Sequence, residues 1–521
     1  MGVSDVQFRA GSWCLRGFAP GTFRAAGSEG KARFMHGTRV WESVERRQLR
    51  RRGPRMERRQ PGQRPDEAQP AGTDLLPPIK HIVVLMMENH SFDNYLGTLG
   101  RGEGLPAGAD GQPDAENPDS QGRPVRAYHL PGTEQHDGVP CQSWSATHAQ
   151  WAEGKMTGFV TATEDSAPRG EKAAAMGYWT EPDLPFYHGL ARTFPLADRW
   201  FSSCLGPTFP NRRFLLAGTA HGLIDDLPVN ILDRPPAGTI LDQLTRYGIS
   251  WANYRPAAED ESRFRQYVHF RRSRAKHHGR ALGPPFQQMK DGVKRELQFT
   301  ASLYPLGLAR YMAHVRSIGQ FLDDADAGTL PGFSIVDPDF DEYSEENPQD
   351  VRKGESFASE IINRVMHGKG WRDTLLIWTY DEHGGYYDHV APPPAVEPDD
   401  VPGRSLVAHR SLLRSVLKPL FPAYVRHAEQ LVSGCGLRYD TYGVRVPAVI
   451  VSPFARPDCV LSEVFDHTSV LKLVEEKWNL PALTRRDAAA SSPLGALDLS
   501  APPAFLTPPP LPAPGLAWGS W

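Results

Sequence analysis

The stretch IKHIVVLMMEN, residues 79–89, decides the fold class of this chain. Its centre, residues 82–87, is continuously apolar, which is typical of a strand buried on both faces of a sheet. Three later stretches have the same character, namely TFPLADRWFSS (193–203), DTLLIWTYDE (373–382) and VRVPAVIVSPF (444–454). Strands of this kind belong mostly to parallel sheets that helices cover on both sides.

Helical patterns lie between these predicted strands. In GESFASEIINRVMHGKG (354–370), large apolar residues recur every four positions and glycines then follow. DHTSVLKLVEEKWN (466–479) begins with Asp466 and Thr468, either of which can cap a helix N-terminus. Apolar strands that alternate with amphipathic helices predict an α/β fold with a largely parallel sheet.

The composition is that of an ordinary globular protein. The chain has 521 residues, of which 40% are hydrophobic and 23% charged, and its formal net charge is -3. This balance argues against a dedicated nucleic-acid binder, so no nucleic acid partner is expected. No apolar run approaches the roughly 18 residues that a membrane span needs, and no secretory signal is visible. We therefore expect a cytoplasmic protein.

Three segments are predicted along the chain. Residues 1–77 are rich in Gly and Arg without periodicity, which indicates a disordered basic arm. Residues 78–482 form the main domain, and residues 483–521 form a Pro/Ala-rich extended tail. Polar or basic insertions into the main domain are expected near residues 100–140, 255–300 and 395–440.

Residues 404–427 carry a basic amphipathic pattern inside the last insertion. They contain five Lys or Arg and no acid, with basic and leucine stripes at helical spacing. Such a helix suits peripheral contact with an anionic membrane. The alternative is a surface helix that packs on its own domain.

The five cysteines are widely spaced, and no CxxC motif is present. A cysteine-rich zinc site is therefore not expected. The spacing favours free buried thiols, with one disulfide, such as Cys435 to Cys459, as the alternative.

Polar side chains follow three of the predicted strands. Open α/β sheets bind ligands at the carboxyl ends of their strands. Glu88 and Asn89 follow the first strand, Thr208 lies a few residues past the second, and Asp381 and Glu382 follow the third. Neighbouring carboxylates repel one another unless a cation neutralises them, so this set predicts a divalent metal site.

Thr208 is the candidate nucleophile of this site. A hydroxyl bound to a metal loses its proton more readily, and Arg212 and Arg213 nearby can clamp phosphate oxygens. A metal, a hydroxyl and arginines together predict phosphoryl transfer. Taken singly, each part has another explanation: a helix cap, a turn hydroxyl, a structural ion pair or a solvated turn.

Four stretches resemble, in order, the four signatures of the phosphoesterase family: ENHSFDNYLG (88–97), GPTFPNRR (206–213), TYDEHGGYYDHV (379–390) and GVRVPAVIVSPF (443–454). That family contains non-specific phospholipases C and a bacterial acid phosphatase. The resemblance covers about residues 79–480, the main domain. It implies an alkaline-phosphatase-like fold, with a mixed, mostly parallel sheet between helical layers.

The resemblance also implies roles for single residues. Those that match the divalent-metal ligands are Glu88, Asn89, Asp381, Glu382 and Thr208. Thr208 would also be the nucleophile that forms a covalent phospho-enzyme.

Further catalytic positions follow the same resemblance. Asn211 and Arg212 match the motif behind the nucleophile, with Arg212 as the phosphate contact. Asp388 and His389 match an orienting acid and the histidine of the third motif. The role of His389 stays open between proton transfer, metal binding and a structural one.

The chain departs from the family at two histidine positions. Gln142 and Asn347 stand where family members often carry histidines. Amides can donate hydrogen bonds to a phosphate, but they cannot transfer a proton near neutral pH.

We therefore predict a metal-dependent phosphoesterase that acts through a threonine phospho-enzyme. Phospholipase C activity on phospholipids is the leading form, and an acid phosphatase acting on soluble phosphomonoesters is the first alternative. A non-enzymatic anion-binding protein is the second. Family members are often secreted, which contrasts with the cytoplasmic location expected from the N-terminus.

Overall fold

An eight-stranded sheet forms the centre of the computed structural model, which describes residues 59–135, 140–164, 171–226, 235–256, 311–404 and 436–519. The strand order is β12-β6-β11-β10-β1-β9-β7-β8. β11 (Ala448–Val451) is antiparallel to both of its neighbours, and the other strands run parallel to one another. The mixed, mostly parallel sheet is therefore confirmed. The parallel strands are β1 (His81–Met87), β6 (Leu196–Ala197), β7 (Trp251–Arg255), β8 (Val315–Ser317), β9 (Phe333–Val336), β10 (Thr374–Tyr380) and β12 (Val460–Leu461).

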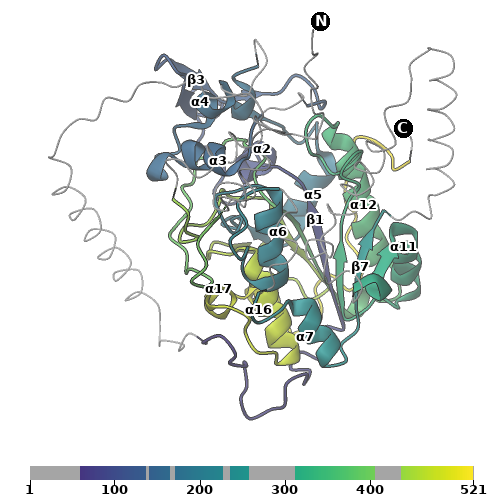
Figure 1. Ribbon diagram of the computed structural model, residues 1–521. Coiled ribbons are helices and arrows are strands. Elements are labelled where there is room, and N and C mark those ends of the chain that lie inside the picture. The colour runs from purple at the N-terminus through teal and green to yellow at the C-terminus, as the bar shows by residue number, and fades with distance from the viewer. Residues whose placement is uncertain are drawn as a thin grey trace, which may run out of the picture.

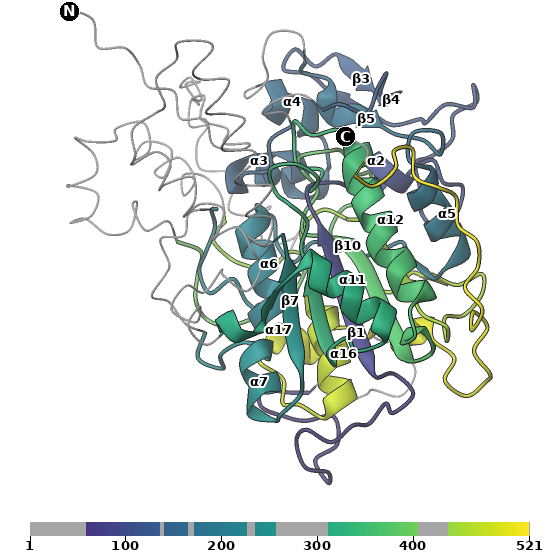
Figure 2. The ribbon, with the colours of Figure 1, turned by 90° about the vertical axis from the view of Figure 1, so that its right-hand side faces the viewer.

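Helices cover both faces of the sheet (Figures 1 and 2). One layer contains α6 (Thr208–Ala217), α7 (Ile240–Arg246) and α16 (His467–Trp478). The other contains α5 (Pro185–Thr193), α11 (Ile318–Ala327) and α12 (Val351–His367). The two helices predicted from periodicity are α12 and α16, and Asp466 is the N-cap residue of α16.

The two central strands explain why the sequence folds this way. Every residue of β10, and every residue of β1 after His81, is buried. Each large aliphatic side chain buried in this way contributes about 1.5–3 kcal/mol. A strand that is apolar on both faces gains this energy only when helices cover both sides of the sheet.

Smaller elements gather beyond the carboxyl ends of the strands, at the top of Figure 1. The predicted insertion 100–140 contributes β2 (Glu116–Pro118), β3 (Pro124–Arg126) and β4 (Tyr128–His129). Near them lie α2 (Phe92–Leu96), α3 (Trp144–Trp151), α4 (Phe159–Glu164) and β5 (Gly177–Tyr178). The other two insertions fall largely outside the described residues, as does nearly all of the basic stretch 404–427.

The disorder predicted for residues 1–77 is wrong for the last part of that arm. Residues 59–77 lie against the C-terminal end of α16, where helix carbonyls lack intrahelical partners. Gly72 N donates to Trp478 O at 2.9 Å, and Leu75 N donates to Lys477 O at 2.7 Å. These carbonyls give the arm a backbone partner that composition does not reveal.

The predicted extended tail also packs on the domain. It begins with α17 (Arg485–Ala489) and a short 3-10 helix, Pro493–Ala496. Farther along, Phe505 N donates to Pro453 O at 3.0 Å, and the Trp518 ring lies against Tyr343 and Phe357. Widely spaced aromatic residues hold this Pro-rich segment in place.

The cysteines differ from the prediction of free thiols. Cys141 is disulfide-bonded, whereas Cys204 and Cys459 are free. The suggested pair Cys435 to Cys459 is therefore wrong.

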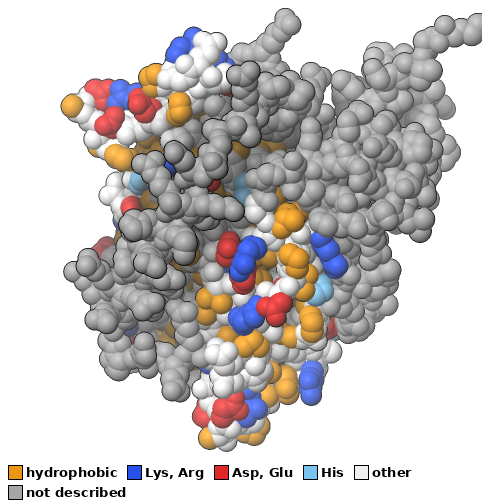
Figure 3. All heavy atoms as spheres, turned by 60° about the vertical axis from the view of Figure 1, so that its left-hand side comes forward, with side chains coloured by type: hydrophobic (Ala, Val, Ile, Leu, Met, Phe, Trp, Pro, Cys, Tyr) orange, Lys and Arg blue, Asp and Glu red, His pale blue; other side chains and the backbone are white. Residues whose placement is uncertain are grey.

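Within the described residues, we find no helix with the length and apolar character to cross a bilayer. On the face shown in Figure 3, acidic and basic side chains of the described residues lie side by side, without a large patch of one sign.

Candidate active site

Three neighbouring strands deliver three carboxylates to one edge of the sheet. The register pairs Met87 of β1 with Tyr380 of β10, so the residues that follow, Glu88 and Asp381, emerge side by side. On the other side of β1, Leu85 pairs with Val336 of β9, which is followed by Asp337. All three acids are buried.

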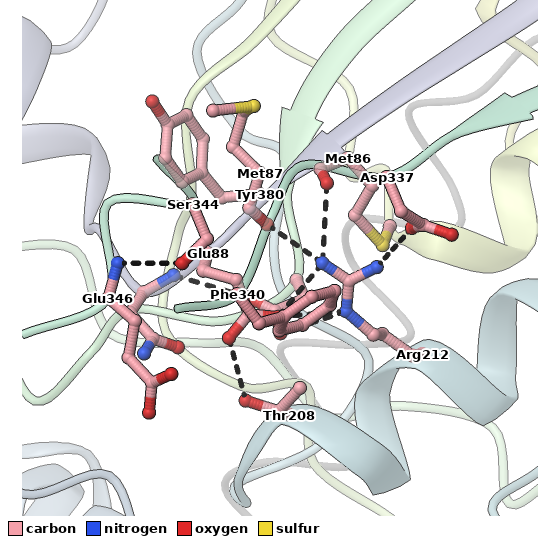
Figure 4. Close-up of polar contacts among 12 residues, drawn as sticks. Met86, Met87, Glu88, Thr208, Arg212, Asp337, Phe340, Ser344, Glu346 and Tyr380 are labelled. Atoms are coloured by element: carbon pink, nitrogen blue, oxygen red, sulfur yellow. Dashed lines mark hydrogen bonds and ion pairs between the residues drawn. The ribbon is translucent and has the colours of Figure 1, made fainter. Parts of the chain in front are cut away.

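Arg212 of α6 contacts these carboxylates, and Figure 4 shows its guanidinium between the helix and the strand ends, close to Asp337 and Glu88. Its Nε lies 3.0 Å from Glu88 Oε1 and 3.3 Å from Asp381 Oδ2, and its Nη1 donates to Asp337 Oδ1 at 2.7 Å. Its Nη2 also points at the carbonyls of Met86 and Met87, both at 3.3 Å. The side chain is fully buried, so Arg212 holds the acids together instead of forming the phosphate contact predicted for it.

Thr208 is the first residue of α6, and its hydroxyl faces Glu88. Its Oγ1 lies 3.4 Å from Glu88 Oε2. The N-cap residue Pro207 has no side chain that can cap the helix, so the positive end of the helix dipole lies at Thr208. This brings the predicted nucleophile to the predicted metal ligands.

Asn211 fixes the loop in front of Thr208. Its Oδ1 accepts from Cys204 N at 3.0 Å, and its Nδ2 donates to the carbonyls of Gly206 at 2.8 Å and Pro207 at 3.1 Å. The Asn211 side chain is completely buried. Its contacts indicate that it positions Thr208 and does not itself meet substrate.

Two buried oxygens of the predicted metal ligands lack a hydrogen-bond partner within the described structure. They are Asn89 Oδ1 and Glu382 Oε1. Asn89 has φ of +69°, a conformation that asparagine tolerates better than most residues, and its amide donates to Asp381 Oδ1 at 3.2 Å. Buried polar atoms are normally paired, so two unpaired oxygens beside clustered acids fit the ligands of a cation.

Burial and neighbouring charges raise the pKa values of Glu88 and Glu382. Burial, followed by the charge of Asp381, raises the pKa of Glu88 well above its usual value. The same two causes raise the pKa of Glu382. In Arg212 the opposite happens: burial lowers the pKa, but the charges of Glu88 and Asp381 prevail and raise it. Negative charge is therefore in excess, as expected of a site that binds a cation.

We use the name Thr208 site for Glu88, Asn89, Thr208, Arg212, Asp337, Asp381 and Glu382. Its donor set is hard and rich in oxygen, which fits a divalent ion such as Mg²⁺, Ca²⁺ or Mn²⁺. The free oxygens of Asn89 and Glu382, together with Glu88, Asp381 and the Thr208 hydroxyl, are the groups that would hold it.

Asp388 and His389, predicted as catalytic, belong to a different group. His389 Nδ1 lies 2.6 Å from Asp93 Oδ2, and Asp388 Oδ1 accepts from Arg445 Nε at 2.8 Å. Arg445 also contacts Asp93 Oδ1 at 3.1 Å and is completely buried. We call Asp93, Asp388, His389 and Arg445 the Arg445 cluster. Among the described residues, no hydrogen bond or ion pair joins it to Thr208, Glu88 or Asp381.

The Arg445 cluster is close-packed enough to hold a metal ion by distance alone. Ligand atoms of Asp93, Asp388 and His389 all lie within 4.8 Å of one another. Arg445, however, already pairs with both acids. Burial lowers the pKa of His389, but the hydrogen bond and charge of Asp93 prevail and raise it, so a second cation is at hand.

Two further acids near the Thr208 site were not predicted. Asp226 accepts from the amide of Phe209, which follows Thr208, at 2.7 Å, and burial raises its pKa to about 8. Glu346 lies in the loop after β9, and its charge contributes to the raised pKa values of Glu88 and Glu382.

Two buried histidines near the site have lowered pKa values. Burial lowers the pKa of His383 to about 3, and His383 Nε2 bonds Gln150 Oε1 at 2.8 Å. Burial also lowers the pKa of His467, whose Nε2 lies 2.7 Å from the carbonyl of Asp381. Both rings brace the segment after β10, and neither replaces the histidines missing at Gln142 and Asn347.

The comparisons with known proteins agree with this geometry. The model of the phosphoesterase family matches residues 79–481. The chain belongs to the phosphoesterase family. It is a phosphoric ester hydrolase.

This phosphoesterase is similar to several curated phospholipases. It is 28% identical over 453 residues to phospholipase C A of Mycobacterium tuberculosis, covering 82% of this chain and 78% of that protein. It is 27% identical over 440 residues to non-specific phospholipase C6 of Arabidopsis thaliana, covering 80% and 71%. It is 29% identical over 438 residues to the non-hemolytic phospholipase C of Pseudomonas aeruginosa, covering 77% and 54%.

Among solved structures, this phosphoesterase is similar to a protein in the alkaline phosphatase superfamily from Vibrio parahaemolyticus. The identity is 9%, the match covers 81% of this chain and 72% of that chain, and the TM-score is 0.35. The fold assignment rests on the sheet topology described above.

Proposed function

We propose that this phosphoesterase is a divalent-metal-dependent phospholipase C with Thr208 as its nucleophile. The observation that carries the proposal is the position of the Thr208 hydroxyl, 3.4 Å from Glu88, in a site where Asn89 and Glu382 keep unpaired buried oxygens. The phospholipid substrate is supported by the curated relatives, which are named phospholipases C and match most of this chain.

The reaction would proceed in two displacements at phosphorus. Thr208 Oγ attacks the phosphodiester, the bond from phosphorus to the diacylglycerol oxygen breaks, and that oxygen takes up a proton. Water then attacks the phosphothreonine, which releases the phosphorylated head group and restores the hydroxyl. A divalent cation held by Glu88, Asn89, Asp381 and Glu382 would supply the positive charge that lowers the pKa of the Thr208 hydroxyl.

The surrounding residues prepare this reaction. Asn211 fixes the approach of Thr208, and Arg212 keeps Glu88 and Asp381 side by side. The N-terminal end of α6 carries partial positive charge, which stabilises the anionic phosphothreonine.

The test is a substrate panel with a matched control variant. Wild type, Thr208→Ala and Thr193→Ala are assayed on phospholipid vesicles and on a soluble aryl phosphate, with and without chelator. Thr193, whose hydroxyl bonds Gly189 O at 2.8 Å, is an ordinary helix threonine. We expect chelator and Thr208→Ala to abolish turnover, and Thr193→Ala to retain it.

The lipid assay also tests the substrate. Turnover should rise sharply above the concentration at which the lipid forms vesicles. Turnover of the soluble ester alone, without such a step, would replace the phospholipase with a soluble-ester phosphatase. Full activity of Thr208→Ala would overturn the proposed nucleophile.

The cellular compartment stays a prediction. The disulfide at Cys141 counts against the cytoplasmic location expected from the sequence, because disulfides persist mainly in oxidising compartments.

A further inference from the structure

Glu345 lies in the loop between β9 and α12, and its carboxylate is completely buried. Three tyrosine hydroxyls from three different elements donate to it. Tyr95 of α2 lies at 2.9 Å and Tyr187 of α5 at 2.6 Å, and Tyr380 of β10 also donates. We call these three side chains the tyrosine socket. Such a network, when fully satisfied, fixes the position of its members.

The backbone of Glu345 is held as firmly as its side chain. Its φ of +78° is unusual for a residue with a long side chain, and such strain concentrates at functional sites. Its carbonyl accepts from Gln135 Nε2 at 2.6 Å and from His90 Nε2 at 3.0 Å. Its amide donates to Gln349 Oε1 at 3.0 Å.

A glycine in α12 makes room for Glu345. A Cβ at Gly354 would lie 2.1 Å from Glu345 Cγ, so no other residue fits there without a shift. Glycine inside a helix is destabilising. The helix therefore tolerates an unfavourable residue where the Glu345 side chain passes.

Both ends of this arrangement lead directly to the Thr208 site. Ser344, the neighbour of Glu345, accepts the amide of Glu88 at 3.1 Å through its carbonyl (Figure 4). Tyr380, one wall of the tyrosine socket, immediately precedes Asp381. On the far side, the amide of Glu346 donates to Ser344 Oγ at 3.2 Å, which fixes the direction in which that acid leaves the loop.

We propose that Glu345 is a positioning residue of the Thr208 site, which sets Glu88, Asp381 and Glu346 in register by anchoring their backbones to the tyrosine socket. The inference rests on the proposed function for its effect on catalysis. Its structural part, the coupling of residue 345 to the backbone at Glu88, stands independently of any substrate.

Three variants and one control test this role. Glu345→Leu removes every bond to the socket, Glu345→Gln keeps the polar shape, and Tyr187→Phe removes a single hydroxyl. The control is Tyr254→Phe. Tyr254 lies on β7 and is also buried, and its hydroxyl donates to Asp324 Oδ2 at 2.7 Å. The control loses hydroxyl bonds to Asp324 and Arg316, which both lie outside the loop that carries Glu345.

The first readout is amide hydrogen exchange of the metal-free protein. We expect exchange in peptides covering residues 84–91 to accelerate about tenfold in Glu345→Leu and severalfold in Tyr187→Phe. Tyr254→Phe should leave these peptides unchanged. Unchanged exchange in both Glu345→Leu and Tyr187→Phe would overturn the proposal. If Glu345→Leu does not fold, Tyr187→Phe decides the question.

The second readout is Mn²⁺ affinity by calorimetry, together with steady-state kinetics. Residues that support metal ligands typically change affinity or activity 10–100-fold when altered. We expect Glu345→Leu to weaken Mn²⁺ binding and lower kcat about tenfold, with KM within twofold, and Glu345→Gln to recover most of both. Variants that lose thermal stability like Tyr254→Phe but keep Mn²⁺ affinity and kcat would show a merely structural role.

The two readouts separate the two proposals. A wild type without Mn²⁺ binding or turnover would contradict the proposed function, while accelerated exchange at residues 84–91 would still support the positioning role.

Discussion

The Thr208 site and the Arg445 cluster contain the same residue types, but they differ in how completely their polar atoms are paired. Each places buried carboxylates around one buried arginine, next to a histidine. In the Arg445 cluster the side-chain polar atoms of Asp93, Asp388 and Arg445 are matched: Arg445 Nη1 donates to the carbonyls of Glu103 and Asp198, both at 2.8 Å. In the Thr208 site, Asn89 and Glu382 keep unpaired oxygens.

The difference shows which signal indicates a cation site in a buried acid cluster. Short distances between acids favour the Arg445 cluster. Unpaired oxygens and uncompensated charge favour the Thr208 site. A buried charge is tolerated when it is paired. We therefore infer that the Arg445 cluster, whose polar atoms are paired, is structural, and that the Thr208 site, whose oxygens are partly unpaired, is functional.

The largest expected effect is the difference in kcat between Thr208→Ala and His389→Ala. Thr208→Ala should lower kcat at least about 1,000-fold, because loss of a nucleophile leaves only binding and electrostatic catalysis. His389→Ala should lower kcat less than tenfold, but cost about 1–3 kcal/mol of stability by removing the imidazole hydrogen bond to buried Asp93. Steady-state kinetics and urea unfolding of both variants check this. A loss of activity in His389→Ala as large as in Thr208→Ala would restore His389 as a catalytic residue.

The next effect concerns the two buried arginines. Arg212→Met and Arg445→Met should each cost about 3–5 kcal/mol in metal-free protein, because each leaves buried acids unpaired. At a cation concentration 100 times the wild-type Kd, wild type and Arg445→Met should each gain about 2.7 kcal/mol, and Arg212→Met should gain more because its unpaired acids bind the cation more tightly. Urea unfolding with and without Mn²⁺ measures both. Equal rescue of the two variants would contradict the distinction.

A smaller effect is expected in the pH dependence of stability. Glu88 and Glu382 have folded pKa values well above their usual ones, and Asp226 is raised to about 8. Their contribution to stability is therefore present below about pH 4, where unfolded carboxylates are also protonated, and is lost as pH rises through the folded values. In chelator, the urea midpoint should fall between pH 5.5 and 8.

Saturating divalent cation should remove most of that slope, because metal replaces the protons. The smaller part due to Asp388, with a pKa raised to about 6 by burial, and to His389 should remain. A slope that is unchanged by cation would place the titrating groups outside the Thr208 site.

The smallest effect on stability is expected at Asn89. Asn89→Gly, which suits φ of +69°, removes an oxygen without a partner and should cost less than about 1 kcal/mol. Metal affinity should nevertheless fall about tenfold, equivalent to about 1.4 kcal/mol. The control is Asn94→Ala, which breaks bonds to Gly177 O and His90 Nδ1, both at 2.8 Å. It should lose stability and keep metal affinity, and the reverse pattern would refute the assignment.

Sequence alone located the strand ends at Glu88 and Asp381, because apolar runs that stop at polar residues mark the carboxyl edge of a sheet. It missed Asp337, although FSIV (333–336) before it shows the same signal in a shorter form. It misjudged Arg212, because burial of an arginine depends on three strands that are neighbours only in space. Asp226 follows no strand, and nothing local marks it.

The packing of the termini and the surroundings of Glu345 also depend on residues that are neighbours only in space, so the sequence did not predict them. The contacts of residues 59–77 with α16 join segments about 400 positions apart in the chain. The tyrosine socket likewise joins residues from α2, α5 and β10. Periodicity describes one segment at a time, so it cannot show where distant segments meet.

The most direct test is anomalous diffraction from crystals grown with Mn²⁺. The account predicts an anomalous peak between Glu88, Asp381 and Glu382, within coordination distance of Thr208 Oγ1 and Asn89 Oδ1, and none within the Arg445 cluster. A peak between Asp93, Asp388 and His389, or no peak at the Thr208 site under saturating Mn²⁺, would contradict it.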